Sequence, residues 1–242
     1  MTSSLKTNLI EPNTGTALTM GQTGQNVLVG GDSIAANTFK DAGGNAIFTS
    51  NGSGVLSGVN TGFGSAQVLI QTQVASDSAS IDFTTGIDST YKEYVFQFIT
   101  IRPESDNYDF AFQANVSGQS GFDETMTTTV IAAYNNEAGT DPYLYYNANA
   151  DQAQGTAYQT LARSRSDDAD HSSSGELHLF NPASTTYIKN WYSVVTGSRT
   201  NNYAWTNLVA GYFNTASAID EVSFKMKTDN IAAGTIKMYG IK

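Results

Sequence analysis

The stretch Tyr108-Asp109-Phe110-Ala111-Phe112-Gln113-Ala114-Asn115-Val116 decides the fold class. Its larger apolar residues alternate with small or polar ones, which is the pattern of a strand with one buried face. A second stretch, residues 93–101, is apolar on both faces and predicts a central strand covered on both sides. No segment carries apolar residues at the spacing of an amphipathic helix. The chain is therefore predicted to be all-β.

Further strands are predicted outward from these two, separated by turn residues such as Asn181-Pro182-Ala183 and Asp229-Asn230. Their ranges are 80–84, 126–134, 157–163, 175–180, 186–196, 203–213, 219–226 and 234–241. About ten strands without helical periodicity are typical of a sandwich. We expect residues 66–242 to form a jelly-roll-like antiparallel β-sandwich head.

Residues 1–65 have a different composition, with 12 of the 22 Gly and 3 of the 27 aromatic residues. Short strands are expected at 17–20, 26–29, 46–49 and 54–57, and a Gly-rich joint follows at 58–65. So little apolar surface cannot offset the backbone entropy of a Gly-rich segment. Either this module is flexible, or it intertwines with neighbouring copies. We favour an intertwined β-repeat module for attachment, with a homotrimer supplying the shared core.

The charge balance excludes several classes of partner. Lys and Arg number 12 against 22 Asp and Glu, for a net charge of −10. Such a chain lacks the clustered basic residues that attract nucleic acids or anionic lipids. Cys is absent, which excludes disulfides. The first residues do not have the pattern of a signal peptide, and no apolar run could span a membrane. We expect neither nucleic-acid binding nor membrane insertion.

Catalytic motifs are missing from the sequence. Gly118-Gln119-Ser120-Gly121-Phe122 lacks the last Gly of a nucleophile elbow. The two histidines, His171 and His178, are seven residues apart, on opposite faces of a strand, and match no metal motif. A carboxylate pair for glycoside hydrolysis, as in a depolymerising enzyme, is not identifiable from spacing. We predict no catalytic residues, no cofactor and no metal.

Two groups of residues are candidates for glycan binding or for contacts between subunits. Asp167, Asp168 and Asp170 lie in the polar run 163–174, whose oxygens suit a hard cation or sugar hydroxyls; a solvated loop is the favoured interpretation. The aromatic group follows Thr140-Asp141-Pro142 and offers ring faces for stacking. Its members are Tyr143, Tyr145 and Tyr146. Trp191 and Trp205, in alternating strands, are expected in the core.

Two stretches carry a resemblance to a known class of proteins. Residues 9–21 and 23–27, including Pro12-Asn13-Thr14-Gly15-Thr16, resemble the N-terminal segment of tailed-bacteriophage virion structural proteins, especially tail fibres of the marine-phage type. Residues 234–242 are similar to the last strand of their β-sandwich domains. The resemblance implies a homotrimeric virion appendage, assembled in the host cytoplasm. Residues 1–65 would bind other virion proteins, and the head would contact host cell-surface polysaccharide.

Two other functions remain open at this point. A capsid decoration, cement or head-fibre protein would place the sandwich on the shell and stabilise it. A free carbohydrate-binding module would use the sandwich alone, although the dependent first module fits that interpretation poorly.

Overall fold

The structure is a computed structural model that describes residues 38–41, 43–50, 53, 56–57, 59, 66–106, 108–163, 166–199 and 202–242. Every regular element among these residues is a β-strand, which confirms the predicted all-β class. The chain divides into two units, Met1–Gly64 and Ser65–Lys242.

The first unit contains a small antiparallel sheet of order β1-β2-β3. Its strands are β1 (Thr38–Lys40), β2 (Ala46–Ser50) and β3 (Leu56–Ser57). Phe39 and Phe48 are register partners, with ring centroids 4.6 Å apart. The strand expected at 46–49 is confirmed as β2, and β3 lies inside the range 54–57. The strands expected at 17–20 and 26–29 lie outside the described residues, and the sharing of core between copies stays a prediction.

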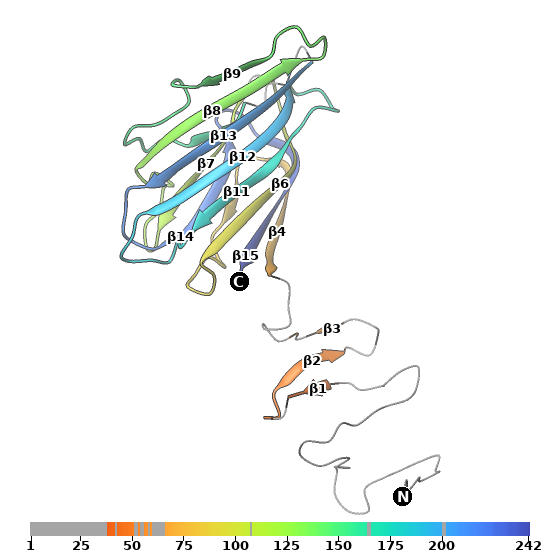
Figure 1. Ribbon diagram of the computed structural model, residues 1–242, viewed down its shortest axis with the longest axis vertical. Coiled ribbons are helices and arrows are strands. Elements are labelled where there is room, and N and C mark those ends of the chain that lie inside the picture. The colour runs from red at the N-terminus through yellow and green to blue at the C-terminus, as the bar shows by residue number, and fades with distance from the viewer. Residues whose placement is uncertain are drawn as a thin grey trace, which may run out of the picture. The chain divides into compact units, whose positions relative to one another are not determined.

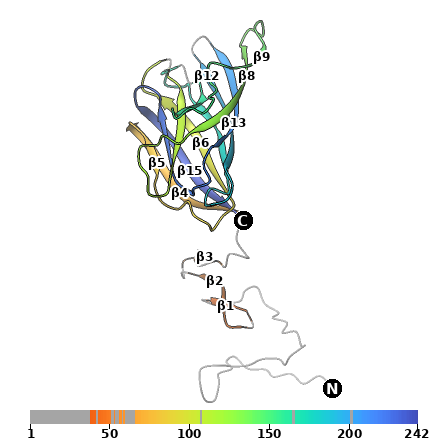
Figure 2. The same cartoon turned by 90° about the vertical axis from the view of Figure 1, so that its left-hand side faces the viewer.

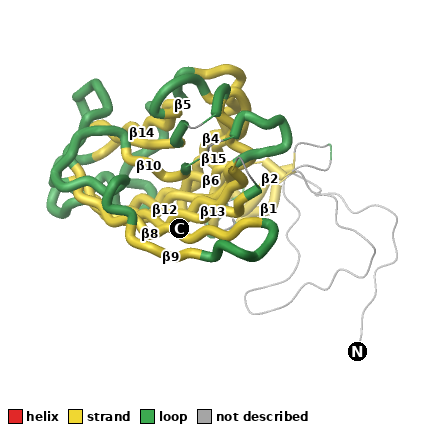
Figure 3. The backbone as a smooth tube through the Cα atoms, turned by 90° about the horizontal axis from the view of Figure 1, so that it is seen from above, coloured by secondary structure: helices red, strands yellow, loops and turns green. Residues whose placement is uncertain are grey.

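The second unit consists of two antiparallel sheets packed face to face (Figure 1, Figure 3). The larger sheet has the order β4-β15-β6-β11-β12-β13-β8-β9, and the smaller has the order β10-β7-β14-β5. The strands are β4 (Gln67–Ser78), β5 (Ile81–Phe83), β6 (Glu93–Pro103), β7 (Phe110–Val116), β8 (Met126–Asn136), β9 (Tyr143–Tyr146), β10 (Gln159–Ala162), β11 (Ser173–Phe180), β12 (Lys189–Arg199), β13 (Tyr203–Phe213), β14 (Ile219–Met226) and β15 (Ile231–Ile241).

Eight of these strands form a jelly roll. The pairs are β4 with β15, β5 with β14, β6 with β11, and β7 with β10. Within this set the first strand pairs with the last, the second with the seventh, the third with the sixth, and the fourth with the fifth. An antiparallel ribbon wound into two sheets gives this pairing, which is the jelly-roll arrangement of two Greek keys. The predicted jelly-roll-like sandwich is confirmed.

The other four strands extend the larger sheet beyond the jelly roll. β8 and β9 are inserted between β7 and β10, and β12 and β13 between β11 and β14. They pair in the order β12-β13-β8-β9 next to β11. Figure 2 shows β9 and β8 at one end of the second unit. Because the smaller sheet has only four strands, it cannot cover the whole inner face of the larger sheet.

The core lies between the two sheets and is built mainly from aromatic rings. Phe96 and Phe98 from the larger sheet pack against Phe224 from the smaller, each with ring centroids 5.2 Å apart. Trp191 packs edge-on against Phe112 at 4.6 Å and is 2% exposed, which confirms its expected core position.

Phe110, Phe112 and Ala114 face the core, as the alternation predicts. The expectation that the other face of β7 is exposed is wrong, because Gln113 on that face is buried and donates to the carbonyl oxygens of Glu124 at 3.0 Å and Thr156 at 2.9 Å in neighbouring loops.

The outer face of β6 differs from the prediction that this strand is covered on both sides. Its inner side chains, such as Phe96, are in the core, but no further layer covers the outer face among the described residues, and Gln97 is exposed there. Val95 is nevertheless buried, because its register partners Tyr239 and His178 flank it on the neighbouring strands.

Candidate functional site

The candidate site lies on the inner face of the extended sheet, where the smaller sheet ends. β10, the edge strand of the smaller sheet, contacts β12 and β13. The segment 147–158 covers the first part of β8: Gln152 N–H donates to Thr128 Oγ1 at 2.8 Å, and Thr128 Oγ1 donates to Gln159 Oε1 at 2.8 Å. The second part of β8 has no such cover, and Tyr134, one of its inward side chains, lines a pocket.

Tyr134 is the central ring of this pocket. It stacks on Trp205 with centroids 4.5 Å apart and an interplanar angle of 12°. Tyr143 and Tyr203 lie 5.7 Å from it, and Tyr145 lies 6.3 Å from it. β-sheet register explains the cluster, because Tyr134 pairs with Tyr143 on β9 and with Trp205 on β13. Cross-strand neighbours on one face lie within contact distance of each other.

Trp205 forms the floor of the pocket and is held on several sides. Its indole Nε1–H donates to Asn207 Oδ1 at 2.9 Å, and the Arg199 guanidinium lies 4.1 Å from its ring centroid. Tyr134 and Arg199 come from β8 and β12, the strands on either side of β13. Trp205 is only 8% exposed, so the ring surface available to a ligand belongs mainly to the tyrosines. Tyr143, for example, is 56% exposed.

Polar groups converge on the same pocket. Tyr203 Oη donates to Asp141 Oδ2 at 3.0 Å. This hydrogen bond raises the pKa of Tyr203, so the phenol stays protonated and oriented toward the carboxylate. The pocket has a volume of about 470 Å³, and its lining consists of Tyr134, Asp141, Tyr143, Tyr145, Arg199, Tyr203 and Trp205. Ring faces with a few fixed polar groups are typical of small-ligand sites.

No family model, curated protein or solved structure matches this chain.

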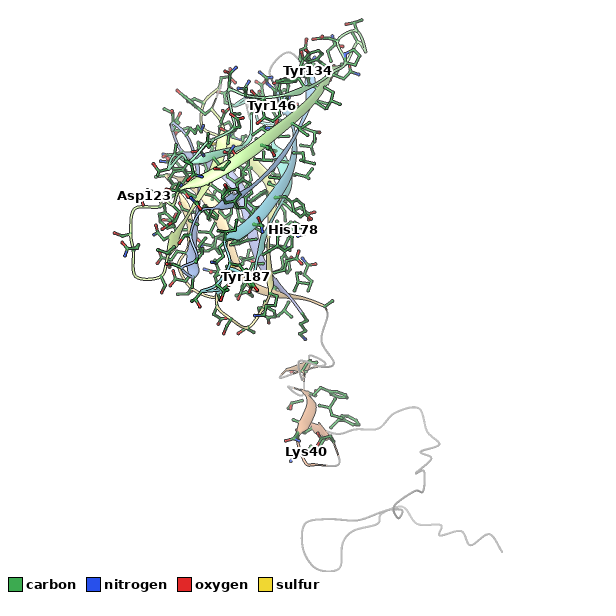
Figure 4. All side chains as sticks on the ribbon, turned by 60° about the vertical axis from the view of Figure 1, so that its left-hand side comes forward. Lys40, Asp123, Tyr134, Tyr146, His178 and Tyr187 are labelled. Atoms are coloured by element: carbon green, nitrogen blue, oxygen red, sulfur yellow. The ribbon has the colours of Figure 1, made fainter. Side chains whose placement is uncertain are left out.

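The three predicted tyrosines fall on two faces of β9. Tyr143 and Tyr145 line the pocket, with ring centroids 5.5 Å apart. Tyr146 lies on the opposite, outer face, where it pairs with Ile131 and its hydroxyl donates to Asp151. Leu144 shares that outer face, as the alternation of a strand requires. Figure 4 labels Tyr146 near the same end of the second unit as the pocket ring Tyr134.

The predicted acidic residues do not line the aromatic pocket. Asp167 N–H donates to Asp106 Oδ1 at 2.9 Å, and Asp168 Oδ2 accepts from Ser166 Oγ at 3.0 Å. Asp170 lines a separate hollow of about 260 Å³ with Arg102. Among the described residues no three His, Asp or Glu side chains are grouped as a metal site would require. Asp167 therefore connects its loop to β6 and the segment after it, where Arg102 also donates to the Asp167 carbonyl at 3.0 Å, and Asp168 is hydrogen-bonded within its own loop.

Sequence reasoning misses the residues that complete the pocket. Tyr134 ends a predicted strand, and Arg199 lies beyond the end of the strand predicted at 186–196, so the pattern singles out neither. Trp205 is buried as expected, but it belongs to the pocket rather than to the central cluster of apolar side chains. The usable signal is the pair Tyr203 and Trp205, whose spacing of two residues places both on one face of a strand.

His178 has a structural environment outside this pocket. Its Nδ1 lies 2.5 Å from Glu93 Oε1, its Nε2 lies 3.2 Å from Glu176 Oε1, and its ring stacks on Tyr192 at 4.6 Å. His171 precedes β11, with its Nδ1 3.7 Å from Asp168 Oδ2. None of the described residues forms a helix of the length and apolarity needed to span a membrane.

Proposed function

We propose that the second unit binds glycans at the aromatic pocket, and that the chain is a component of a homotrimeric bacteriophage tail fibre or similar virion appendage. The observation that carries the glycan proposal is the convergence of four tyrosines, Trp205, Asp141 and Arg199 on one pocket of about 470 Å³. Sugar rings present C–H groups that pack on aromatic faces, and hydroxyls that bind charged and phenolic groups.

The side chains of the pocket differ in their exposure to solvent, and therefore in the contacts that each can make with a glycan. Tyr143 and Tyr145 offer ring surface on the edge strand β9, and Tyr134 and Trp205 support them from behind. Asp141 can accept hydrogen bonds from sugar hydroxyls, and Arg199 can donate them. Because Tyr203 already donates to Asp141, the carboxylate is fixed before a ligand arrives. Such preorganisation lowers the entropic cost of binding.

The proposal is for binding without turnover. Among the described residues that line the pocket, Asp141 is the only one with a carboxyl group. Glycoside hydrolysis by acid and base or nucleophile uses two carboxyl groups flanking the scissile bond. The pocket thus offers recognition groups and one half of a hydrolytic pair.

The virion setting rests on the sequence resemblance of residues 9–27 and 234–242 to tail-fibre proteins. A homotrimer would present three pockets on one particle, and multivalent attachment strengthens weak individual contacts. Residues 1–65 are proposed to bind other virion proteins, with assembly in the host cytoplasm. Copy number in purified particles, measured by quantitative mass spectrometry, tests this setting. A small multiple of three supports an appendage; copies in the hundreds would favour a capsid decoration protein.

Glycan binding is tested with the purified full chain on a printed array of bacterial polysaccharides and lipopolysaccharides. We expect Tyr143→Ala and Tyr145→Ala each to weaken the binding of array hits by about tenfold, the value of one aromatic contact of about 1.4 kcal/mol. Tyr187→Ala is the matched control, because Tyr187 is 67% exposed and lies outside the pocket. Figure 4 labels Tyr187 and Tyr134 toward opposite ends of the second unit.

The outcomes separate the alternatives. Loss of binding in both pocket variants with retention in Tyr187→Ala supports the site. Binding that survives both pocket substitutions places recognition elsewhere on the chain. Absence of binding to every arrayed glycan and to host envelope fractions contradicts the glycan proposal.

A further inference from the structure

The outer face of the larger sheet, turned away from the smaller sheet, has a charged half and an uncharged half. Register partners on successive strands form a row across this face from β15 to β9. The row includes Lys237, Glu176, Val194, Leu208, Ile131 and Tyr146. The change occurs between β11 and β12. Over β12, β13, β8 and β9, which the structure describes in full, no outward-facing position is Asp, Glu, Lys or Arg. We call this half the charge-free face.

Apolar side chains are exposed side by side on the charge-free face. Val194 is 36% exposed, Leu208 43% and Ile131 44%, and they are direct neighbours across three strands. On β9, Tyr146 is 52% exposed and Leu144 69% exposed. Contiguous exposed apolar residues of this kind mark interaction surfaces, whereas scattered ones do not.

The size and shape of the face suit a protein partner. With strands about 4.8 Å apart and a rise of about 3.3 Å per residue, the face covers about 600 Å². This face and an equal area on the copy opposite it bury about 1,200 Å² in total, the lower end for a specific protein interface. A hollow of about 490 Å³ lies on it, lined in part by Tyr192 and Tyr212 of the face and by Phe180 of β11, and can receive a partner's side chain as an anchor.

The charge of the whole molecule identifies the partner. At a net charge of −10, two copies of this chain repel each other, and a contact between charged surfaces would add to that cost. A surface without charges of either sign adds no such repulsion when it meets another copy. A basic partner would instead be recognised through acidic side chains, which lie on the other half of the face at Glu93 and Glu176. Depletion of charge at the centre is typical of interfaces between identical subunits.

We infer that the charge-free face is buried against another copy of this chain in the assembled protein. The inference rests on the homo-oligomer of the proposed function and is independent of glycan binding. It assigns the surface through which the second units contact each other. Asp151, which accepts from the Tyr146 hydroxyl, then lies at the rim of the interface, where charged groups remain hydrated.

Single-cysteine labelling tests the inference without disrupting the assembly, because the chain contains no Cys of its own. Leu208→Cys on the charge-free face is compared with Val74→Cys on β4, using a maleimide reagent and the full-length chain. The exposed fractions, 43% for Leu208 and 67% for Val74, account for less than a twofold difference in labelling rate. We expect Leu208→Cys to react at least tenfold more slowly, in a protein whose mass by light scattering is that of an oligomer.

The other possible outcomes of the labelling experiment contradict either the assigned surface alone or the homo-oligomer as well. A wild-type chain of monomeric mass contradicts both the homo-oligomer and this inference. Equal labelling of the two cysteines in an oligomer contradicts the assigned surface alone. Slow labelling of Leu208→Cys in a monomer also overturns the inference, since the same chain would then cover the face.

A charge introduced on the face gives a second, independent readout. We expect Leu208→Glu to lower the urea concentration at which the oligomer dissociates, whether or not residues 1–65 also hold the copies together, and Val74→Glu to leave it unchanged. Both variants should bind arrayed glycans in the same order as the wild type, because neither residue lines the aromatic pocket. An oligomer that is equally stable in Leu208→Glu overturns the inference, while the glycan proposal stands or falls on the pocket variants.

Discussion

At the scale of single residues, the aromatic pocket depends on Tyr134, because its ring contacts Tyr143, Tyr145, Tyr203 and Trp205. Removing it leaves a cavity and unsupported neighbours. We expect Tyr134→Ala to lower the free energy of unfolding by about 3 kcal/mol, as loss of a packed aromatic ring does. Tyr143→Ala should cost less than about 0.5 kcal/mol at its exposed position. Urea denaturation of the two variants measures both values.

Tyr134→Phe is the control for this comparison, since it keeps the ring and removes only the hydroxyl. It should stay within about 1 kcal/mol of the wild type. If Tyr134→Phe were as destabilised as Tyr134→Ala, the hydroxyl rather than the stacked ring would support the pocket.

Lys189 gives a prediction on pH. Its side chain is buried, and Nζ donates to the carbonyl oxygens of Tyr187 at 2.6 Å and Ala216 at 3.2 Å. Burial lowers the pKa of Lys189 below its usual 10.5. The unfolded chain therefore holds this proton to higher pH than the folded chain, and the contribution of Lys189 to stability rises with pH between the lowered pKa and 10.5.

The measurement is the free energy of unfolding of wild type and Lys189→Met at several pH values from neutral pH up to the ordinary lysine pKa of 10.5. The difference, wild type minus variant, should increase with pH over this window. Taking the difference cancels the opposite contribution of buried tyrosines such as Tyr94, whose pKa burial raises. A difference that stays constant with pH would contradict the lowered pKa.

At the scale of elements, the sequence predicts strands well where one face is in the core, including the edge strands β5 and β10 of the smaller sheet, and misses the two edge strands of the larger sheet. β13 and β14 have the predicted bounds, 203–213 and 219–226. β4, an edge strand of twelve residues, is not predicted because polar Gln and Ser residues occur on both faces, and Leu69 and Val74 are exposed. The residues of β9 are expected at a loop edge for a similar reason. Its alternate residues meet a pocket and solvent, so neither face has the composition of a core.

The close approach of β11 and β12 makes Gly175 sensitive to substitution. A Cβ at this position would lie 2.2 Å from the Val194 carbonyl oxygen and 2.7 Å from Val195 Cα, both backbone atoms. The strands would have to move apart, as in an overpacked core. We expect Gly175→Ala to lower the free energy of unfolding by about 1–3 kcal/mol. Thermal or urea unfolding of the variant tests this, and the substitution Val74→Ala, at a side chain that is 67% exposed on β4, provides the control, with an expected change below about 0.5 kcal/mol. Wild-type stability in Gly175→Ala would mean that the strands yield freely.

At the scale of the whole molecule, the sequence predicts the sandwich and two residues of the pocket, but neither the individual strand pairs nor the complete site. Alternation shows which residues of a strand face the core, but the pairing of β4 with β15 joins segments that lie near opposite ends of the second unit's sequence. The pocket has the same origin: Tyr134 and Tyr143 come from one inserted hairpin and Tyr203 from the other. Only the register of three strands brings these rings together, so a search for local motifs finds Tyr143 and Tyr145 and misses the rest.

The pairing of β4 with β15 also determines which terminal segment can be removed without unfolding the second unit. Removing residues 1–65 leaves all its strand pairs in place, including the hydrogen bond from Lys242 N–H to the Ala66 carbonyl at 2.9 Å. Removing 231–242 deletes β15, which pairs with both β4 and β6 and buries Ile236 and Met238. We expect the truncated chain 66–242 to unfold in one cooperative transition by calorimetry. The truncated chain 1–230 should show no cooperative transition of the second unit. A cooperative transition of the second unit in 1–230, or its absence in 66–242, would contradict a jelly roll that is closed by its last strand.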